Sequence, residues 1–232
     1  MAVGIVQTKN VTVSSLTTSH VLTFNSSVTV GNWVVIAWRQ GTNNRTPSVP
    51  APSAGTWSGL QDFVASNGTT NARIYCWSAQ HTGTATDTYT ITIGGSNTAV
   101  GVIQGWELSG VDASGIPRGG SATQFLASSS SWNLIASPGV DLSSGDIIIG
   151  AAGEAGSGWG TLTSPSGFTT RFGSALTPAT STWMGDNLTA GTGITGAAST
   201  TIARAVYTGY QIYKQPAAVT AAKNLLLLGV GT

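Results

Sequence analysis

The chain has 232 residues, of which 41% are hydrophobic and only 7% are charged, and its net charge is +1. Ordinary soluble proteins carry about 25% charged residues, so Ser, Thr, Asn, Gln and Gly must cover this surface. The nine basic residues form no run or stripe, which argues against the phosphate-binding cluster of a nucleic-acid partner. The longest apolar run, "NLLLLGVG", is far too short for a membrane span.

Apolar stretches rich in Val, Ile, Thr, Trp and Tyr alternate with Gly/Ser/Thr/Asn loops, and no long segment has helical spacing. This pattern predicts an all-β fold with few or no helices. In chain order, the first series of predicted strands is 4–13, 20–24, 33–39, 60–66, 72–79, 87–93 and 99–109. The second series is 123–127, 132–136, 146–153, 168–174, 180–186, a stretch near 192–202, and 203–214.

The two series repeat one pattern. "GNWVVIAWR" begins at residue 31 and "GDIIIGAAG" at residue 145, and "SGLQDFVAS" at 58–66 matches "SGFTTRFGS" at 166–174. Near the end of each series, Gly105–Trp106 aligns with Gly209–Tyr210. The sequence therefore predicts an internal two-fold repeat, with copies at about 3–112 and 121–214.

The repeated run has no polar alternation, which predicts strands that are buried on both faces. In a β-sandwich, the other sheet would cover one face of such a strand. A loop or a neighbouring subunit would cover the second face, so the pattern suggests a partner.

The phrases "VTVGNWVVIAWRQG", "SSGDIIIGAAG" and "GVIQGWELSGVD" resemble those of Gly/Ser/Thr-rich jelly-roll domains in phage structural proteins and bacterial secreted proteins. The resemblance covers about residues 3–214. It implies a jelly-roll β-sandwich over residues 1–215, in which each half contributes inner strands to both sheets. Two separate domains are the alternative, although no Pro-rich or charged linker divides the halves.

Residues suited to catalysis or metal binding are few. His20 and His81 are the only histidines and Cys76 is the only cysteine, so a zinc site lacks ligands. We interpret Cys76 as a buried small side chain and the histidines as ordinary polar residues. Glu107 and Glu154 each follow an apolar run and are the best pair of carboxylates for a glycosidase. No phosphate-loop, dinucleotide or calcium-loop motif is present, so no cofactor is predicted.

Eight tryptophans divide into two groups. Those inside predicted strands are interpreted as packing residues: Trp33, Trp38, Trp77, Trp106 and Trp183. Those in or beside loops could contact a protein or stack on a sugar, or could fold back over the end of the sandwich: Trp57, Trp132 and Trp159.

The C-terminal segment 216–232 follows the last predicted strand and contains four consecutive leucines, Leu225, Leu226, Leu227 and Leu228. Such an apolar segment would expose a patch if it lay free in water. We expect it to be an arm that docks on a neighbouring subunit or on the capsid, the alternative being that it packs on its own domain.

Together these features predict a non-enzymatic structural protein of a tailed-phage virion, and more specifically a capsid decoration (cement) protein. The expected partners are the major capsid protein or another virion protein, and further copies of the chain in a homotrimer. The N-terminus lacks a basic region followed by an apolar region, so the expected location is the virion, after synthesis in the host cytoplasm. The alternatives are a carbohydrate-binding module that uses the loop tryptophans, a tail or fibre adhesion protein, and a glycosidase.

Overall fold

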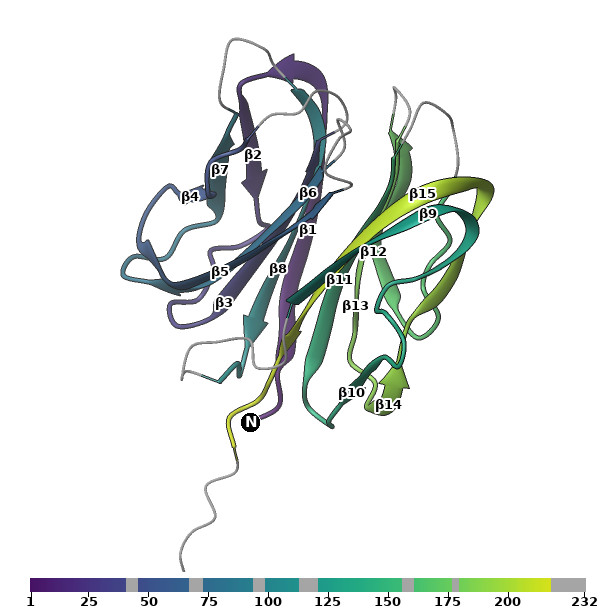
Figure 1. Cartoon of the computed structure of the whole chain (residues 1–232). Coiled ribbons are helices and arrows are strands. Elements are labelled where there is room, and N and C mark those ends of the chain that lie inside the picture. The colour runs from purple at the N-terminus through teal and green to yellow at the C-terminus, as the bar shows by residue number, and fades with distance from the viewer. Residues whose placement is uncertain are drawn as a thin grey trace, which may run out of the picture.

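The computed structural model describes residues 1–40, 46–66, 73–93, 99–112, 121–155, 161–176 and 180–217. These residues form β-strands in four antiparallel sheets and no helix (Figure 1). The prediction of an all-β, sandwich-type fold is therefore confirmed. No helix able to cross a membrane occurs in this part of the chain.

The first half of the chain supplies the strands of two facing sheets. Their bounds are β1 (Gly4–Thr17), β2 (Ser19–Thr23), β3 (Trp33–Gln40), β4 (Ala51–Pro52), β5 (Thr56–Ser66), β6 (Arg73–Thr82), β7 (Thr88–Thr92) and β8 (Ala99–Ser109). A five-stranded sheet has the order β1-β8-β3-β6-β5, and a three-stranded sheet has the order β2-β7-β4. Alternate residues of β3, namely Val34, Ile36 and Trp38, point into the core between these sheets.

The second half builds a similar pair. Its strands are β9 (Ser121–Asn133), β10 (Val140–Leu142), β11 (Ile147–Ala155), β12 (Thr169–Leu176), β13 (Thr180–Asn187), β14 (Gly191–Ile194) and β15 (Ala197–Tyr213). The five-stranded order is β12-β13-β11-β15-β9, and β10 pairs with β14. Ile148, Trp183 and Ile212 belong to the core of this half.

The two five-stranded sheets pack face to face, so the molecule has four layers (Figure 1). A third core fills the space between them, with Trp33, Val35 and Trp106 from the first half and Ile149 and Tyr213 from the second. Strands β3 and β11 are consequently buried on both faces, as predicted. The second face of each strand is covered by the other half of the same chain, so this burial does not call for a partner.

The distribution of strands differs from the expectation that each half contributes to both sheets of one sandwich. Each five-stranded sheet takes all of its strands from one half. Pairing within a half closes shorter loops than pairing between halves, so it costs less chain entropy. The result is two sandwiched units that share the central core.

The hydrogen-bond registers of the two five-stranded sheets correspond, with one correction to the sequence alignment. Val35 on β3 is paired with Trp106, and Ile149 on β11 is paired with Gln211. When β3 and β11 are aligned on their preceding glycines, Trp106 therefore corresponds to Gln211 and not to Tyr210. The predicted alignment was wrong by one residue, which reverses the face on which each side chain lies.

Candidate functional site

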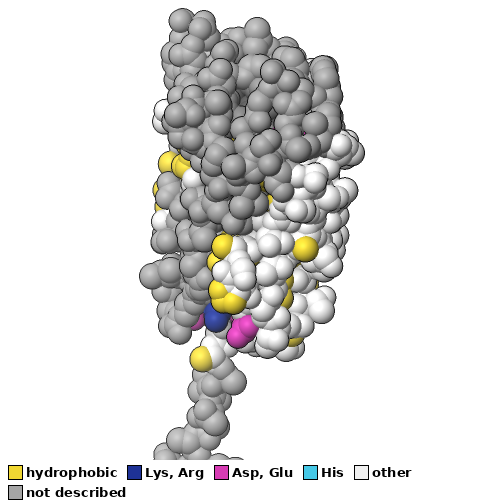
Figure 2. Space-filling model, turned by 45° about the vertical axis from the view of Figure 1, so that its right-hand side comes forward, with side chains coloured by type: hydrophobic (Ala, Val, Ile, Leu, Met, Phe, Trp, Pro, Cys, Tyr) yellow, Lys and Arg dark blue, Asp and Glu magenta, His cyan; other side chains and the backbone are white. Residues whose placement is uncertain are grey.

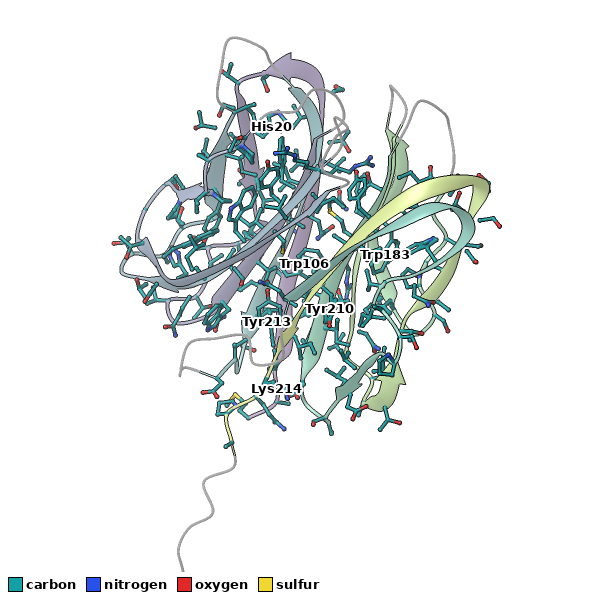
Figure 3. The ribbon with its side chains drawn as sticks, in the orientation of Figure 1. His20, Trp106, Trp183, Tyr210, Tyr213 and Lys214 are labelled. Atoms are coloured by element: carbon teal, nitrogen blue, oxygen red, sulfur yellow. The ribbon has the colours of Figure 1, made fainter. Side chains whose placement is uncertain are left out.

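Among the polar contacts that cross the interface between the five-stranded sheets, two occupy corresponding positions. Trp106 Nε1 donates a hydrogen bond to Asp186 Oδ2 at 2.9 Å, and Ser78 Oγ donates to Gln211 Oε1 at 3.2 Å. Ser78 and Asp186 occupy corresponding positions. Ser78 is paired with Val35 of β3, and Asp186 is paired with Ile149, the residue of β11 that corresponds to Val35. Each half thus supplies one member of each contact, as in the isologous interface of a symmetric dimer. Trp106 lies between the sheets in Figure 3.

Asp186 also forms an ion pair at this interface. Arg171 Nε donates to Asp186 Oδ2 at 2.6 Å and Arg171 Nη2 donates to Asp186 Oδ1 at 3.1 Å. The hydrogen bonds to this carboxylate raise the pKa of the Arg171 guanidinium. The Asp186 side chain is fully buried. Through its contacts with Arg171 of β12 and Trp106 of β8, it connects these two strands to its own strand, β13.

Arg39 links the halves further along β3. Its Nη1 donates to the Thr182 hydroxyl, its Nη2 donates to the backbone carbonyl of Glu154 at 3.0 Å, and its guanidinium lies 5.6 Å from the centre of the Tyr207 ring. Burial lowers the pKa of Arg39 and raises the pKa of Tyr207. The Glu154 carboxylate oxygens are buried near this group without a hydrogen bond from any residue that the structure describes.

Glu107 has a structural role in the turn that precedes β3. Its Oε1 accepts hydrogen bonds from the Thr29 backbone N–H at 2.9 Å and from Asn32 Nδ2 at 2.6 Å, and its Oε2 accepts one from Gln7 Nε2 at 2.6 Å. The side chain is fully buried, so the carboxylate fixes the loop from which β3 starts.

The structure does not bring Glu107 and Glu154 together. Glu107 is paired with Val34 at the start of β3, whereas the carbonyl of Glu154 accepts from Arg39 near its end. These two β3 positions lie about 16 Å apart along the strand. Paired glycosidase carboxylates lie at most about 9.5 Å apart, so these positions give the predicted pair no support.

Both histidines are buried in the first half. His20 Nδ1 accepts a hydrogen bond from Trp38 Nε1 at 2.9 Å, and His81 lies between a backbone carbonyl and the Tyr89 hydroxyl. Both rings are therefore held by hydrogen bonds within this core, and His81 lies in β6. Cys76 is buried in the central core, as predicted. Among the described residues, no group of three or more His, Cys, Asp or Glu side chains could hold a metal ion.

The five tryptophans predicted to pack inside strands are all buried, as expected: Trp33, Trp38, Trp77, Trp106 and Trp183. The expectation that Trp132 contacts a partner is corrected by the structure. Trp132 lies in β9, is 3% exposed and belongs to the core of the second half. It cannot serve as part of an exposed surface for a protein or sugar. Trp57 is half-buried, with its ring centre 5.7 Å from that of Tyr89. Trp159 lies outside the described residues.

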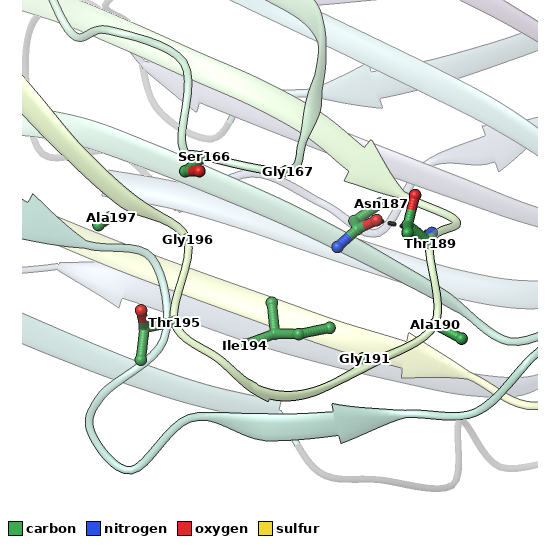
Figure 4. Close-up of a pocket in the computed structure, with 10 residues that line it drawn as sticks. All are labelled: Ser166, Gly167, Asn187, Thr189, Ala190, Gly191, Ile194, Thr195, Gly196 and Ala197. Atoms are coloured by element: carbon green, nitrogen blue, oxygen red, sulfur yellow. Dashed lines mark hydrogen bonds between the residues drawn. The ribbon is translucent and has the colours of Figure 1, made fainter.

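A pocket of about 370 Å³ opens at one end of the second half (Figure 4). It lies between the turns at 166–167, 187–191 and 194–197. Asn187 is 4% exposed, and its Oδ1 accepts a hydrogen bond from the Thr189 backbone N–H at 2.7 Å. Figure 4 shows the Asn187 amide nitrogen turned away from Thr189, toward the space between the turns. No local sequence motif marks this site, and sequence reasoning missed it.

The chain leaves the body beside its N-terminus, at the lower end in Figures 1 and 3. Asp146 Oδ1 accepts a hydrogen bond from the Gln215 backbone N–H, and Gln215 Nε2 donates to the Ser144 carbonyl. The Lys214 carbonyl accepts from the Asp112 backbone N–H at 2.9 Å. These bonds fix the start of the C-terminal segment. Leu225–Leu228 lie outside the described residues.

Charged side chains are few on the face shown in Figure 2, and those visible gather at its lower end, where the chain leaves the body. Uncharged polar side chains and backbone cover most of the described part of that face. The burial of the described charged groups agrees with this, since Arg39, Glu107, Asp146, Glu154 and Asp186 are all buried.

Comparisons with protein families, with curated proteins and with solved structures found no match to this chain.

Proposed function

We propose that this protein is a non-catalytic structural protein of a phage virion, and more specifically a capsid decoration protein. Its partner would be the major capsid protein or another virion protein, and its working form a homotrimer on the shell. The sequence resemblance to phage jelly-roll domains supports this assignment. The chain would contribute surface and rigidity, without chemistry.

The observation that carries the proposal is the use made of the buried polar side chains. Glu107 fixes a turn, Asp186 and Arg39 join the two halves, and both histidines bond within the core of the first half. Groups with such partners are restrained by the fold, whereas a catalytic group must face a space that a substrate can enter. A four-layer body tied together in this way suits a protein that works by covering another surface.

The fold of each half supports the same proposal. In the first half, the sheet β1-β8-β3-β6-β5 faces the sheet β2-β7-β4, and apart from the β5-β6 pair the neighbours in each sheet come from distant parts of the half. We propose that this is a jelly-roll order, and that the corresponding order in the second half arose by internal duplication. Virus capsid proteins are among the proteins that use double-sheet jelly rolls.

The mechanism would be stabilisation by selective binding. A protein that binds the assembled lattice and not the free subunits shifts the equilibrium toward the lattice. At a free concentration of 100 times the Kd, each occupied site contributes about 2.7 kcal/mol. The low charge reduces repulsion between neighbouring copies, and the fixed exit of the C-terminal segment would direct the arm toward its binding surface.

The test is co-sedimentation of the purified protein with capsids of the phage that encodes it. We expect saturable binding to assembled shells, no binding to free capsid subunits, and a higher temperature for DNA release from the decorated particles. A chain that ends at residue 217 serves as the matched variant and should lose most of this binding. Failure of the full chain to bind the shells would refute the proposal.

The alternative function is that of a carbohydrate-binding module. Trp132 is buried and cannot stack on a sugar, so among the described loop tryptophans Trp57 remains as the candidate. A glycan array distinguishes the two functions. Saturable binding to a glycan that is lost in Trp57→Ala would favour the module, or an adhesion protein of the tail or fibre.

A further inference from the structure

The end of the first half is closed by three ring side chains. Trp57 on β5 is paired with His81 on β6, and both rings pack on Tyr89 of β7, with ring-centre distances of 5.7 Å and 6.0 Å. The Tyr89 hydroxyl is hydrogen-bonded to His81 Nδ1 at 3.1 Å. The rings therefore fill the space between the two sheets at this end.

The same positions in the second half carry smaller side chains. The shift of 108 residues that relates Ser78 to Asp186 places Pro165 at the position of Trp57 and Thr189 at the position of His81. Each of these replacements removes a ring system or shortens the side chain.

The third ring is also replaced. Tyr89 lies four residues before Ile93, which bridges Pro47, and Gly196 lies four residues before Thr200, which bridges Leu162 in the same way. Leu22, the partner of Tyr89, is matched by Leu134, whose backbone N–H donates a hydrogen bond to the Gly196 carbonyl. Gly196 therefore takes the place of Tyr89. Thr189 and Gly196 both line the pocket of about 370 Å³, so the pocket lies where the first half keeps its rings.

Asn187 gives this pocket a polar group that faces its interior (Figure 4). Its Oδ1 is held by the Thr189 backbone N–H, which fixes the orientation of the side chain. Its Nδ2 is given no hydrogen-bond partner by the described residues and faces the pocket (Figure 4). An amide N–H donor in a small, largely apolar pocket would select a ring that carries an acceptor oxygen.

We propose that this pocket receives the side chain of a tyrosine on a partner protein, with its phenolic oxygen accepting a hydrogen bond from Asn187 Nδ2. The proposal rests on the proposed function, in which the chain docks on another virion protein. An indole fits less well because its nitrogen only donates. Aromatic side chains in such pockets are typical anchors of protein interfaces.

The test uses N-acetyl-tyrosinamide as the probe and the full chain, with binding followed by amide chemical shifts in NMR spectra. We expect shifts confined to the turns at 166–167, 187–191 and 194–197. N-acetyl-phenylalaninamide lacks the hydroxyl and should bind two- to tenfold more weakly, the usual value of one hydrogen bond. Asn187→Ala removes the amide donor and leaves no acceptor for the phenolic O–H, so it should abolish this preference.

The filling variant Ile194→Tyr places a ring in the pocket and should block the probe, with an unchanged circular dichroism spectrum as its control. No shifts with wild type, equal binding of the two amides, or stronger binding of methyl glucoside would each overturn the proposal. Capsid binding without probe binding would refute this inference alone. Probe binding without capsid binding would refute the proposed function alone.

Discussion

The hydrogen bond between Trp106 and Asp186 allows a quantitative test of the interface between the two halves. In Asp186→Ala, the Trp106 N–H keeps no acceptor in a fully buried position, which costs about 1–3 kcal/mol. The ion pair with Arg171 is also lost. Because the Arg171 side chain is 29% exposed, water solvates part of the released charge, and we assign about 1 kcal/mol to this loss.

The free energy of unfolding should therefore fall by about 2–4 kcal/mol, as measured by urea denaturation followed by circular dichroism. For a chain of this size, that corresponds to a decrease in Tm of about 4–16 °C. The matched control is Ser78→Ala at the corresponding position of the first half. It should cost less than about 1 kcal/mol, since Gln211 Oε1 still accepts a hydrogen bond from the Tyr213 hydroxyl.

A double-mutant cycle separates the two terms. In a Trp106→Phe background there is no indole N–H to leave without a partner, so Asp186→Ala should cost at least about 1 kcal/mol less than in the wild type. If the cost is the same in both backgrounds, or if it does not exceed that of Ser78→Ala, our assignment of the interface contact is wrong.

Three further predictions follow from the buried groups and from the continuous central core. Burial raises the pKa of Tyr207 and Tyr213, so above about pH 10 the unfolded state loses these protons first. The free energy of unfolding should then fall by about 1.4 kcal/mol per pH unit for each tyrosine, and constant stability up to about pH 11 in urea titrations would contradict this. Glu107→Gln should lower the free energy of unfolding by about 1–3 kcal/mol, because an amide N–H₂ would face donors that now bind the carboxylate; an unchanged urea midpoint would rule this out. Cleavage at a protease site inserted into 113–120 should leave both halves in one peak in size-exclusion chromatography, and separate peaks would show that the central core does not hold them.

Strand positions followed from the sequence because apolar runs are local signals. The run at 33–39 predicted β3 to within one residue of its observed end. The short strands β4 and β10 were missed, since two or three residues carry no periodicity. The register of β15 was misassigned because the resemblance of Gly105–Trp106 to Gly209–Tyr210 is chemical, whereas the register is set by pairing with β11.

The interface and the pocket were beyond sequence reasoning for a different reason. Both depend on which sheets of the two halves pack against each other, and no local residue pattern predicts that packing. Thr189 and Gly196 line the pocket where the first half has rings, and Pro165, at the position of Trp57, lies beside Gly196. Only an alignment of the two copies in the correct register could have revealed it.

The face-to-face packing also sets a problem of timing during synthesis. The first half can complete its own sandwich once residue 112 has left the ribosome, but Trp33, Val35 and Trp106 then face water on the outer side of its sheet. At about 5–20 residues per second, the remaining strands take on the order of 5–20 s to be translated. During that interval the nascent chain exposes an ordered apolar surface. First halves on neighbouring ribosomes of one messenger RNA can then associate with one another before their own second halves are synthesised.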